Sequence, residues 1–156
     1  MTKSSRNVSA GRMSGGQAAV EALRAEGTRH VFGLIGSATM EMFDALYDAD
    51  DVSFIGVHDE RTGTHMADGY ARASGGVGVV LAGQNGPGAT NLVTGLAQAK
   101  AAYSPVVSVA GALSTAHQYR DAFQEVDQQS LFAPITKKTW TVPSVDRVPE
   151  IFREAF

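Results

Sequence analysis

The sequence predicts an α/β fold, a doubly wound parallel sheet with helices on both faces. Apolar, strand-like runs alternate with helical patterns along the whole chain, which is typical of sheets built from strand-helix-strand units. One of these runs, residues 77–82, is apolar without alternation, as in a parallel strand that is covered on both faces. Right-handed crossovers between such strands place helices on either side of the sheet.

In the first half of the chain, serines and glycines mark where the expected helices begin and end. Ser14 and Ser37 precede helical patterns and are expected N-caps, whereas Gly27 and residues 74–76 are expected to end helices. The expected elements are a helix from Ser14 to about Arg24, a strand over 30–35, a helix over 40–46, a strand over 52–57 and a helix over 60–73.

The second half continues the alternation. Residues 138–142 alternate apolar and polar side chains, which predicts an outer strand. A last helix is expected from residues 143–144, because apolar residues then recur at helical spacing. The expected elements are a strand over 77–82, a glycine loop, a helix over 89–102, a strand over 106–110, a polar loop over 111–126, a short helix over 128–132, the outer strand and the last helix.

Length and composition favour one domain over residues 14–156, preceded by a flexible tail over residues 1–13. The tail holds basic residues, Ser and Gly without an apolar stretch, so it is not a secretory signal. The chain has no cysteine, which excludes disulfides and thiolate metal sites and agrees with the cytoplasmic location that we expect. The net charge of −3, with both signs interspersed, predicts neither nucleic-acid nor membrane partners.

Several motif-based functions are excluded. The glycine loops at 33–37 and 83–88 match neither the dinucleotide fingerprint nor the P-loop. The four histidines lack metal-ligand spacing, so no metal site is expected in this chain. A glycine loop alone favours a tight turn, but it also lets a backbone approach a ligand closely. Asp68 and Arg72 are spaced to form a stabilising pair on a helix.

Glu60 stands where an apolar strand turns into a helix. Ligands of open α/β sheets bind at the carboxyl ends of strands, so a carboxyl group there is a candidate for proton chemistry. The alternative is an ordinary acid in the first turn, favoured by the helix dipole. Position alone favours this second interpretation.

Five segments in a fixed order change that interpretation. Together they resemble the N-terminal, pyrimidine-binding (PYR) domain of thiamine-diphosphate enzymes of the acetolactate synthase type, over about residues 15–156. Residues 84–88 are also similar to sulfoacetaldehyde acetyltransferase. The segments are residues 32–37, Glu60 with residues 67–73, residues 85–91, residues 121–125 and residues 134–137.

The resemblance implies that Glu60 is catalytic and hydrogen-bonds N1′ of the cofactor's aminopyrimidine, in a dry pocket where the carboxyl can donate. This bond favours the imino tautomer that removes the C2 proton, so that the cofactor attacks a 2-oxo acid and accepts the electrons of decarboxylation. The remaining implied contacts are Pro87, Asn91 and Gly36 to the cofactor, and Ile35, Ser37, Phe123, Gln124 and Lys137 to the substrate. Residues 35–37 depart from the usual Pro-Gly-Gly, so the substrate stays open.

The resemblance also implies parts that this sequence does not contain. A separate domain, in a longer chain or a partner subunit, holds the diphosphate and Mg²⁺, and the last strand of the PYR domain is missing. We therefore expect the N-terminal part of a lyase or transferase that decarboxylates a 2-oxo acid and transfers the acyl unit. It is expected to form a homodimer or homotetramer, and FAD is possible in the full-length protein. Two alternatives stay open: a short subunit of a two-chain decarboxylase, and a truncated non-catalytic homologue.

Overall fold

The computed structural model describes residues 12–156, so the expected tail lies almost entirely outside the described residues. Its centre is a sheet of four strands in the order β2-β1-β3-β4, and every neighbouring pair is parallel. This confirms the predicted fold class. The strands are β1 (His30–Gly33), β2 (Ser53–Gly56), β3 (Gly78–Ala82) and β4 (Val106–Ala110).

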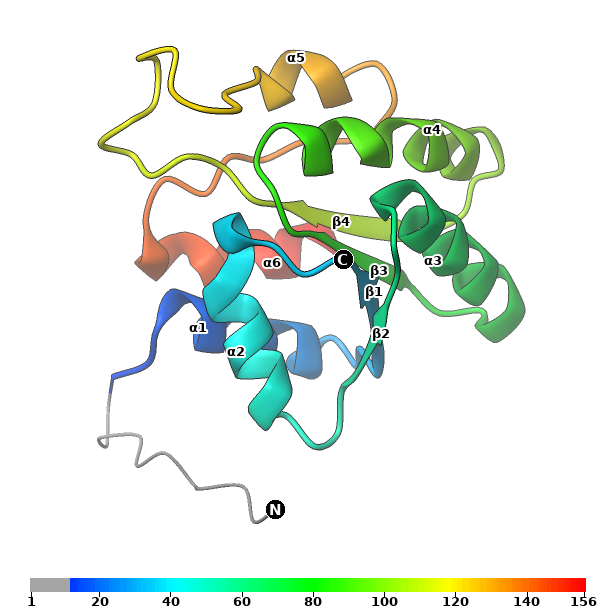
Figure 1. Cartoon of the computed structure of the whole chain (residues 1–156). Helices are drawn as coiled ribbons and strands as arrows, with labels where there is room; N and C mark the ends of the chain where they lie inside the picture. The colour runs from blue at the N-terminus through cyan, green and yellow to red at the C-terminus, as the bar shows by residue number, and fades with distance from the viewer. Residues whose placement is uncertain (1–11) are drawn as a thin grey trace.

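Helices cover both faces of the sheet (Figure 1). One layer consists of α1 (Gly15–Ala25), α2 (Met40–Asp48) and α6 (Val148–Ala155). The other consists of α3 (Glu60–Ser74), α4 (Pro87–Ala101) and the short α5 (Gln128–Phe132). Two 3₁₀ turns, η1 (Ser37–Thr39) and η2 (Val145–Arg147), lead into α2 and α6.

The central strand β3 divides the core into two. Val79 and Leu81 pack with α1, α2 and α6, whereas Val80 and Ala82 pack with α3 and α4. Successive side chains of a strand point to opposite faces, so one apolar run serves both layers. All of β3 is buried, as its continuous apolar sequence predicts.

The predicted helix caps are confirmed at three positions and wrong at a fourth. The Ser14 hydroxyl accepts from the Gln17 amide at 3.2 Å, and the Gln17 side chain accepts from the Ser14 amide at 2.8 Å. Gly27 and Gly75 have φ angles of 79° and 71°, the left-handed conformation that ends a helix. Ser37 is not an N-cap, because it lies inside η1 and its hydroxyl donates to the Gln84 side chain at 2.8 Å.

The prediction of a strand over residues 138–142 is wrong. The segment pairs with no strand of the described residues. Its alternate side chains are held by α6 instead, since Lys138 Nζ and Trp140 Nε1 lie 3.3 and 2.9 Å from a carboxylate oxygen of Glu154. The alternating pattern therefore reflects a segment that packs one face on α6. Within residues 12–156, no neighbouring strand completes a ladder with this segment.

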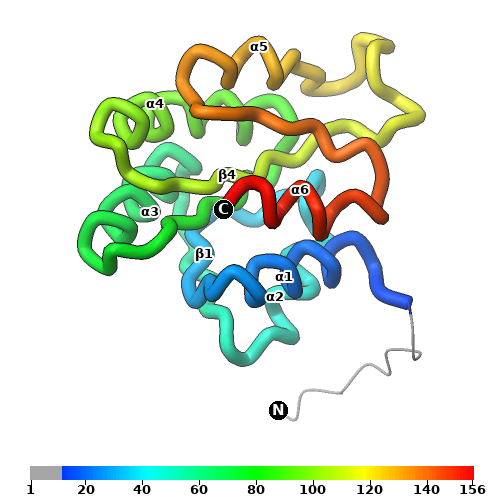
Figure 2. Tube along the Cα trace, turned by 180° about the vertical axis from the view of Figure 1, so that it is seen from behind, coloured from blue at the N-terminus to red at the C-terminus, as the bar shows by residue number. Residues whose placement is uncertain are grey.

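A groove of about 1970 Å³ runs along β4 and is also lined by residues 138–142. Residues of α1, α4 and α6 border it as well, so it opens between the two helix layers. Because β4 is the last strand in the sheet order, its outer edge has no ladder partner within residues 12–156. Figure 2 shows α6 running along α1 and ending close to β4.

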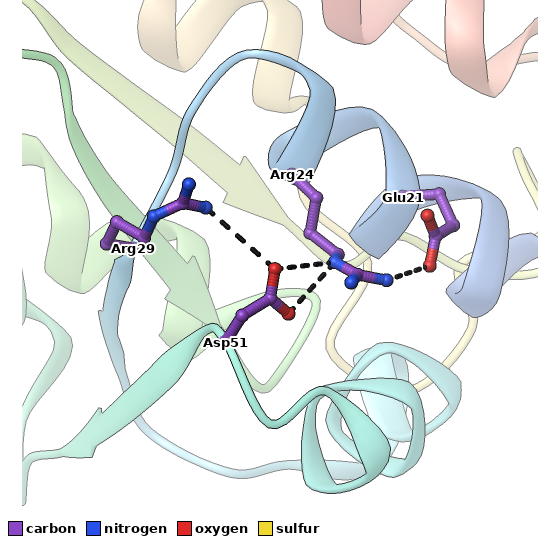
Figure 3. Close-up of polar contacts among 4 residues, drawn as sticks. All are labelled: Glu21, Arg24, Arg29 and Asp51. Atoms are coloured by element: carbon purple, nitrogen blue, oxygen red, sulfur yellow. Dashed lines mark hydrogen bonds and ion pairs between the residues drawn. The ribbon is translucent and has the colours of Figure 1, made fainter.

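A cluster of charged residues ties α1 to the segments that enter β1 and β2 (Figure 3). Arg24 contacts Glu21 at 2.6 Å and Asp51 at 2.9 Å, and Arg29 lies 3.9 Å from Asp51. These side chains are well exposed, so they contribute little stability. They lie at the amino ends of the strands, away from Glu60. Between residues 12 and 156, no helix has the length and hydrophobicity needed to cross a bilayer.

Candidate functional site

Glu60 is the first residue of α3, and its carboxyl is buried although it lies beside a helix end. The capping role belongs to its neighbour, because the Asp59 side chain accepts from the Arg61 amide at 2.8 Å. Glu60 is only 3% exposed. An acid that served the helix dipole alone would stay in water, so this burial favours the interpretation of Glu60 as a functional group.

The Glu60 carboxylate is enclosed by α4. Its Oε2 accepts from Asn91 Nδ2 at 3.0 Å. On the other side, a Cβ built on Gly88 would lie 3.0 Å from Oε1, so a side chain there would press on the carboxylate. The start of α4 thus supplies an amide donor from Asn91 and, at Gly88, a position without a side chain beside Glu60.

The two helices approach closely enough for this contact because small residues face each other. A Cβ built on Gly95 would lie 2.5 Å from the Cβ of Thr64, so only glycine permits the observed packing. Thr64 is fully buried and its hydroxyl donates to the Glu60 carbonyl at 2.8 Å. The spacing of α3 and α4 therefore fixes where the carboxyl of Glu60 can lie.

The glycine loops after β1 and β3 meet beside this carboxyl. A Cβ on Gly36 would lie 2.4 Å from the carbonyl carbon of Gly83, and the Ala38 amide donates to the Gly83 oxygen at 3.0 Å. The chain leaves β1 toward β2 and β3 toward β4 on opposite sides, so this is the switch point where open α/β sheets bind ligands. The expectation of tight turns is confirmed by this backbone contact, whereas close approach to a ligand stays a prediction.

The structure brings together some of the expected substrate residues and not others. Ser37, Phe123 and Gln124 line one cavity of about 360 Å³ at the carboxyl ends of β3 and β4. Ile35 is 60% exposed and does not line this cavity. Lys137 lines the groove along β4 instead.

The expected cofactor residues lie on the loops and the helix around Glu60. Pro87 is the first residue of α4, Asn91 lies one turn later, and Gly36 lies at the junction with Gly83. Their roles remain predictions. Within residues 12–156, no three His, Asp or Glu side chains cluster in a way that could hold a metal ion.

Sequence reasoning gave no individual role to Asn85 and Gly88, although both lie in the segment over 85–91, and it did not connect Gln128 to this region. Asn85 is 8% exposed and donates to two backbone carbonyls of the loop after β4. Gln128 donates to the carbonyl of Asn85 at 2.8 Å. No sequence pattern signals these contacts, since they join residues some 40 positions apart.

A carboxylate at the far end of the α3–α4 pair forms the predicted bond to Arg72. Asp68 is 2% exposed and accepts from Arg72 Nε and Nη2, both at 2.8 Å, and Gln98 adds a bond at 3.2 Å. Burial by itself would raise the pKa of Asp68, but the hydrogen bonds from Arg72, Ser104 and Gln98 and the charge of Arg72 outweigh it and hold that pKa below its ordinary value. The pair stabilises the helices, as the sequence predicts.

Comparisons with known proteins agree with this arrangement. The family model for the thiamine pyrophosphate enzyme, N-terminal TPP binding domain, matches residues 13–131. The chain is 47% identical, over 92% of its length, to a protein named probable acetolactate synthase large subunit from Methanocaldococcus jannaschii. It is 46% identical, over 92% of its length, to the acetolactate synthase isozyme 2 large subunit of Escherichia coli. It covers 24% and 26% of these two relatives, about a quarter of their length.

Proposed function

The chain belongs to the family of thiamine pyrophosphate enzymes, as their N-terminal TPP-binding domain, and from this premise we propose that it forms the pyrimidine side of an acetolactate synthase-like active site. The complete enzyme would decarboxylate a 2-oxo acid and transfer the resulting acyl unit to an acceptor. When bound, thiamine diphosphate supplies a nucleophilic carbon and accepts the electrons released by decarboxylation.

The burial of Glu60 is the observation that carries this proposal. A carboxyl that is 3% exposed and has Asn91 at 3.0 Å can form a strong hydrogen bond to a ring nitrogen, because little water competes for it. In the proposed site Glu60 hydrogen-bonds N1′ of the aminopyrimidine, and Asn91 orients the carboxyl from α4. We assign the bond to N1′ to Glu60 and not to its neighbour Asp59, because the Asp59 side chain caps α3.

Glycines near Glu60 and at the switch point support the proposed cofactor contacts. Gly88 places no side chain next to Oε1, and Gly36 and Gly83 let the two loops meet at the switch point. Pro87 opens α4 next to these glycines. We assign Pro87, Asn91 and Gly36 to the cofactor, and Ser37, Phe123 and Gln124 with Ile35 and Lys137 to the substrate or its channel.

The proposal extends to parts of the enzyme outside this chain. A diphosphate-binding domain, in a longer chain or in a partner subunit, would hold the diphosphate and Mg²⁺. The length of the relatives, about four times that of the matched region, supports such a domain. We further propose a homodimer or homotetramer in the cytoplasm, with room for FAD in the full-length protein.

The test replaces Glu60 by Gln in the complete protein. Gln has the same shape, but it cannot exchange a proton with N1′. Exchange of the C2 proton of bound thiamine diphosphate, followed by NMR, should fall by about 10²- to 10⁴-fold, the range typical of general acid–base groups.

A matched control separates this role from a generic effect of a helix-start acid. Glu41 lies in the first turn of α2 and is exposed, so Glu41→Gln should leave C2 exchange unchanged. Near-normal C2 exchange in Glu60→Gln, with the cofactor still bound, would overturn the proposed role.

A further inference from the structure

The loop that follows β4 carries an unusual backbone. Tyr119, Asp121 and Gln124 have φ angles of 61°, 53° and 61°, in the left-handed region that residues other than glycine rarely adopt. Such conformations persist only where neighbouring structure holds them. The loop also supplies Phe123 and Gln124 to the cavity beside the switch point.

Asn85 holds this loop from the glycine segment after β3. Its Nδ2 donates to the carbonyl oxygens of Phe123 at 3.2 Å and of Gln124 at 3.1 Å. Gly86 lies against the same place, because a Cβ built on it would be 2.4 Å from the Gln124 carbonyl oxygen. Both protons of one buried amide are therefore used to fix two consecutive carbonyls.

Gln128 forms hydrogen bonds on the other side of the contact between Asn85 and the loop. Its Nε2 donates to the carbonyls of Asn85 at 2.8 Å and of Gly111 at 2.7 Å. It thereby joins the start of α5 to the ends of β3 and β4. Asn85 and Gln128, which we call the amide clamp, connect the three segments that surround the cavity.

The clamp leaves one polar atom without a partner. Within residues 12–156, Gln124 Oε1 is buried and accepts no hydrogen bond, an arrangement that costs stability unless a donor reaches it. Gln124 lines the cavity, together with Ser37 and His117. The Gln124 side chain therefore stands at the cavity with its amide oxygen unpaired within residues 12–156.

We propose that the amide clamp positions Phe123 and Gln124 for the substrate by fixing the backbone of the loop that carries them. Asn85 and Gln128 are positioning residues, since they act through the backbone of the loop. This inference rests on the proposed function of the site. It adds that substrate affinity depends on an interaction remote from Glu60.

The experiment uses Gln128→Glu in the complete enzyme, saturated with thiamine diphosphate and Mg²⁺. A carboxylate of the same shape cannot donate to the carbonyls of Asn85 and Gly111. The KM for the 2-oxo acid should rise at least about fivefold, the lower end of the effect of losing a buried hydrogen bond, with a much smaller change in kcat. The affinity for thiamine diphosphate should stay within about twofold, because the Glu60–Asn91 contact is untouched.

Gln129→Glu is the matched control. It is the next residue of α5, makes the same change in charge, and bonds Thr141 at 2.6 Å instead of the clamp. Its KM should equal that of the unmodified enzyme. An equal rise in KM for both variants would assign the effect to charge and overturn the clamp.

Asn85→Ser provides a second, uncharged approach. The shorter side chain cannot reach both carbonyls, so amide hydrogen exchange of residues 119–125 should accelerate along with the rise in KM. Unchanged exchange and unchanged KM would overturn the inference, as would a parallel loss of cofactor affinity, which would indicate a merely structural role.

If Gln128→Glu fails to fold, Asn85→Ser decides by the same readouts. If the unmodified enzyme binds no thiamine diphosphate, the proposed function is overturned. The effect of the clamp on the loop can then still be measured by amide hydrogen exchange.

Discussion

At the scale of single residues, the proposed site depends on glycines, which have no side chain, as much as on the carboxyl of Glu60. Glu60 was predicted as a site residue only through the resemblance to a family, because its place after a strand alone favoured an ordinary acid of the first helical turn. No role could be predicted for Gly88, because a glycine in a loop predicts a turn equally well. Only the distance of 3.0 Å from a built Cβ to Glu60 Oε1 shows that a methyl group there would meet the carboxylate.

We therefore predict that Gly88→Ala weakens cofactor binding without unfolding the domain. The added methyl group must push the Glu60 carboxylate by a few tenths of an ångström, away from Asn91 and from N1′. The Kd for thiamine diphosphate, measured by calorimetry on the complete protein, should rise about tenfold, as expected for a misplaced charge-assisted hydrogen bond.

Gly69→Ala is the matched control for this substitution. Gly69 lies inside α3, and a Cβ built there meets nothing within 4 Å. Alanine in an open helical position should raise the free energy of unfolding by about 0.5–1 kcal/mol and leave the Kd unchanged. An unchanged Kd in Gly88→Ala would mean that the carboxylate does not need its present place.

At the scale of elements, the sequence predicted which segments form helices and strands but not how each meets its neighbours. Residues 138–142 alternate as a strand does, yet a strand also needs a partner, and no strand of residues 12–156 pairs with this segment. Ser37 has the side chain of an N-cap, but it lies inside η1, where its hydroxyl donates to Gln84. Such competition between long-range partners cannot be read from local patterns.

The α3–α4 pair gives a prediction about pH. The pKa of Asp68 lies below its ordinary value, so its ion pair stabilises the fold above the pKa of the unfolded chain, about 3.9. That stability is lost as the pH falls through the lower folded value. Asp68→Asn should therefore lower the free energy of unfolding by about 1.5 kcal/mol at pH 7, because the half-exposed Arg72 stays solvated when it loses its partner. The difference from the unmodified chain should shrink below about pH 4.

Urea unfolding at pH 7 and at pH 3 measures this difference. Glu150→Gln is the control, because it removes an exposed i,i+3 pair with Arg147 and should change stability by less than about 1 kcal/mol at pH 7. A loss for Asp68→Asn that is equally large at both pH values would show that shape, and not charge, makes this contact important.

At the scale of the whole molecule, the two outer strands β2 and β4 each pair on one side only among residues 12–156. They differ in what lies beside them. β4 faces a groove of about 1970 Å³ that lies between the helix layers and is bounded by residues 138–142, whereas β2 does not line it. An exposed strand edge inside a groove is a template for one more strand. The resemblance implies that the PYR domain has one more strand than this chain, which stays a prediction.

We predict that a polypeptide which continues beyond residue 156 adds a parallel strand to β4, in this groove. The end of α6 lies close to β4 (Figure 2), so a chain leaving α6 can enter the groove by a short connection, and its strand would separate β4 from residues 138–142.

In a polypeptide extended beyond residue 156, the outward-facing amides of β4 should exchange hydrogen at least about tenfold more slowly than in the 156-residue chain, because they gain ladder bonds. Amides of β3, which already pair on both sides, are the internal control and should not change. Equal exchange of β4 in both polypeptides would contradict the prediction, and protection that appears in the 156-residue chain only at high concentration would identify a second copy as the occupant of the groove.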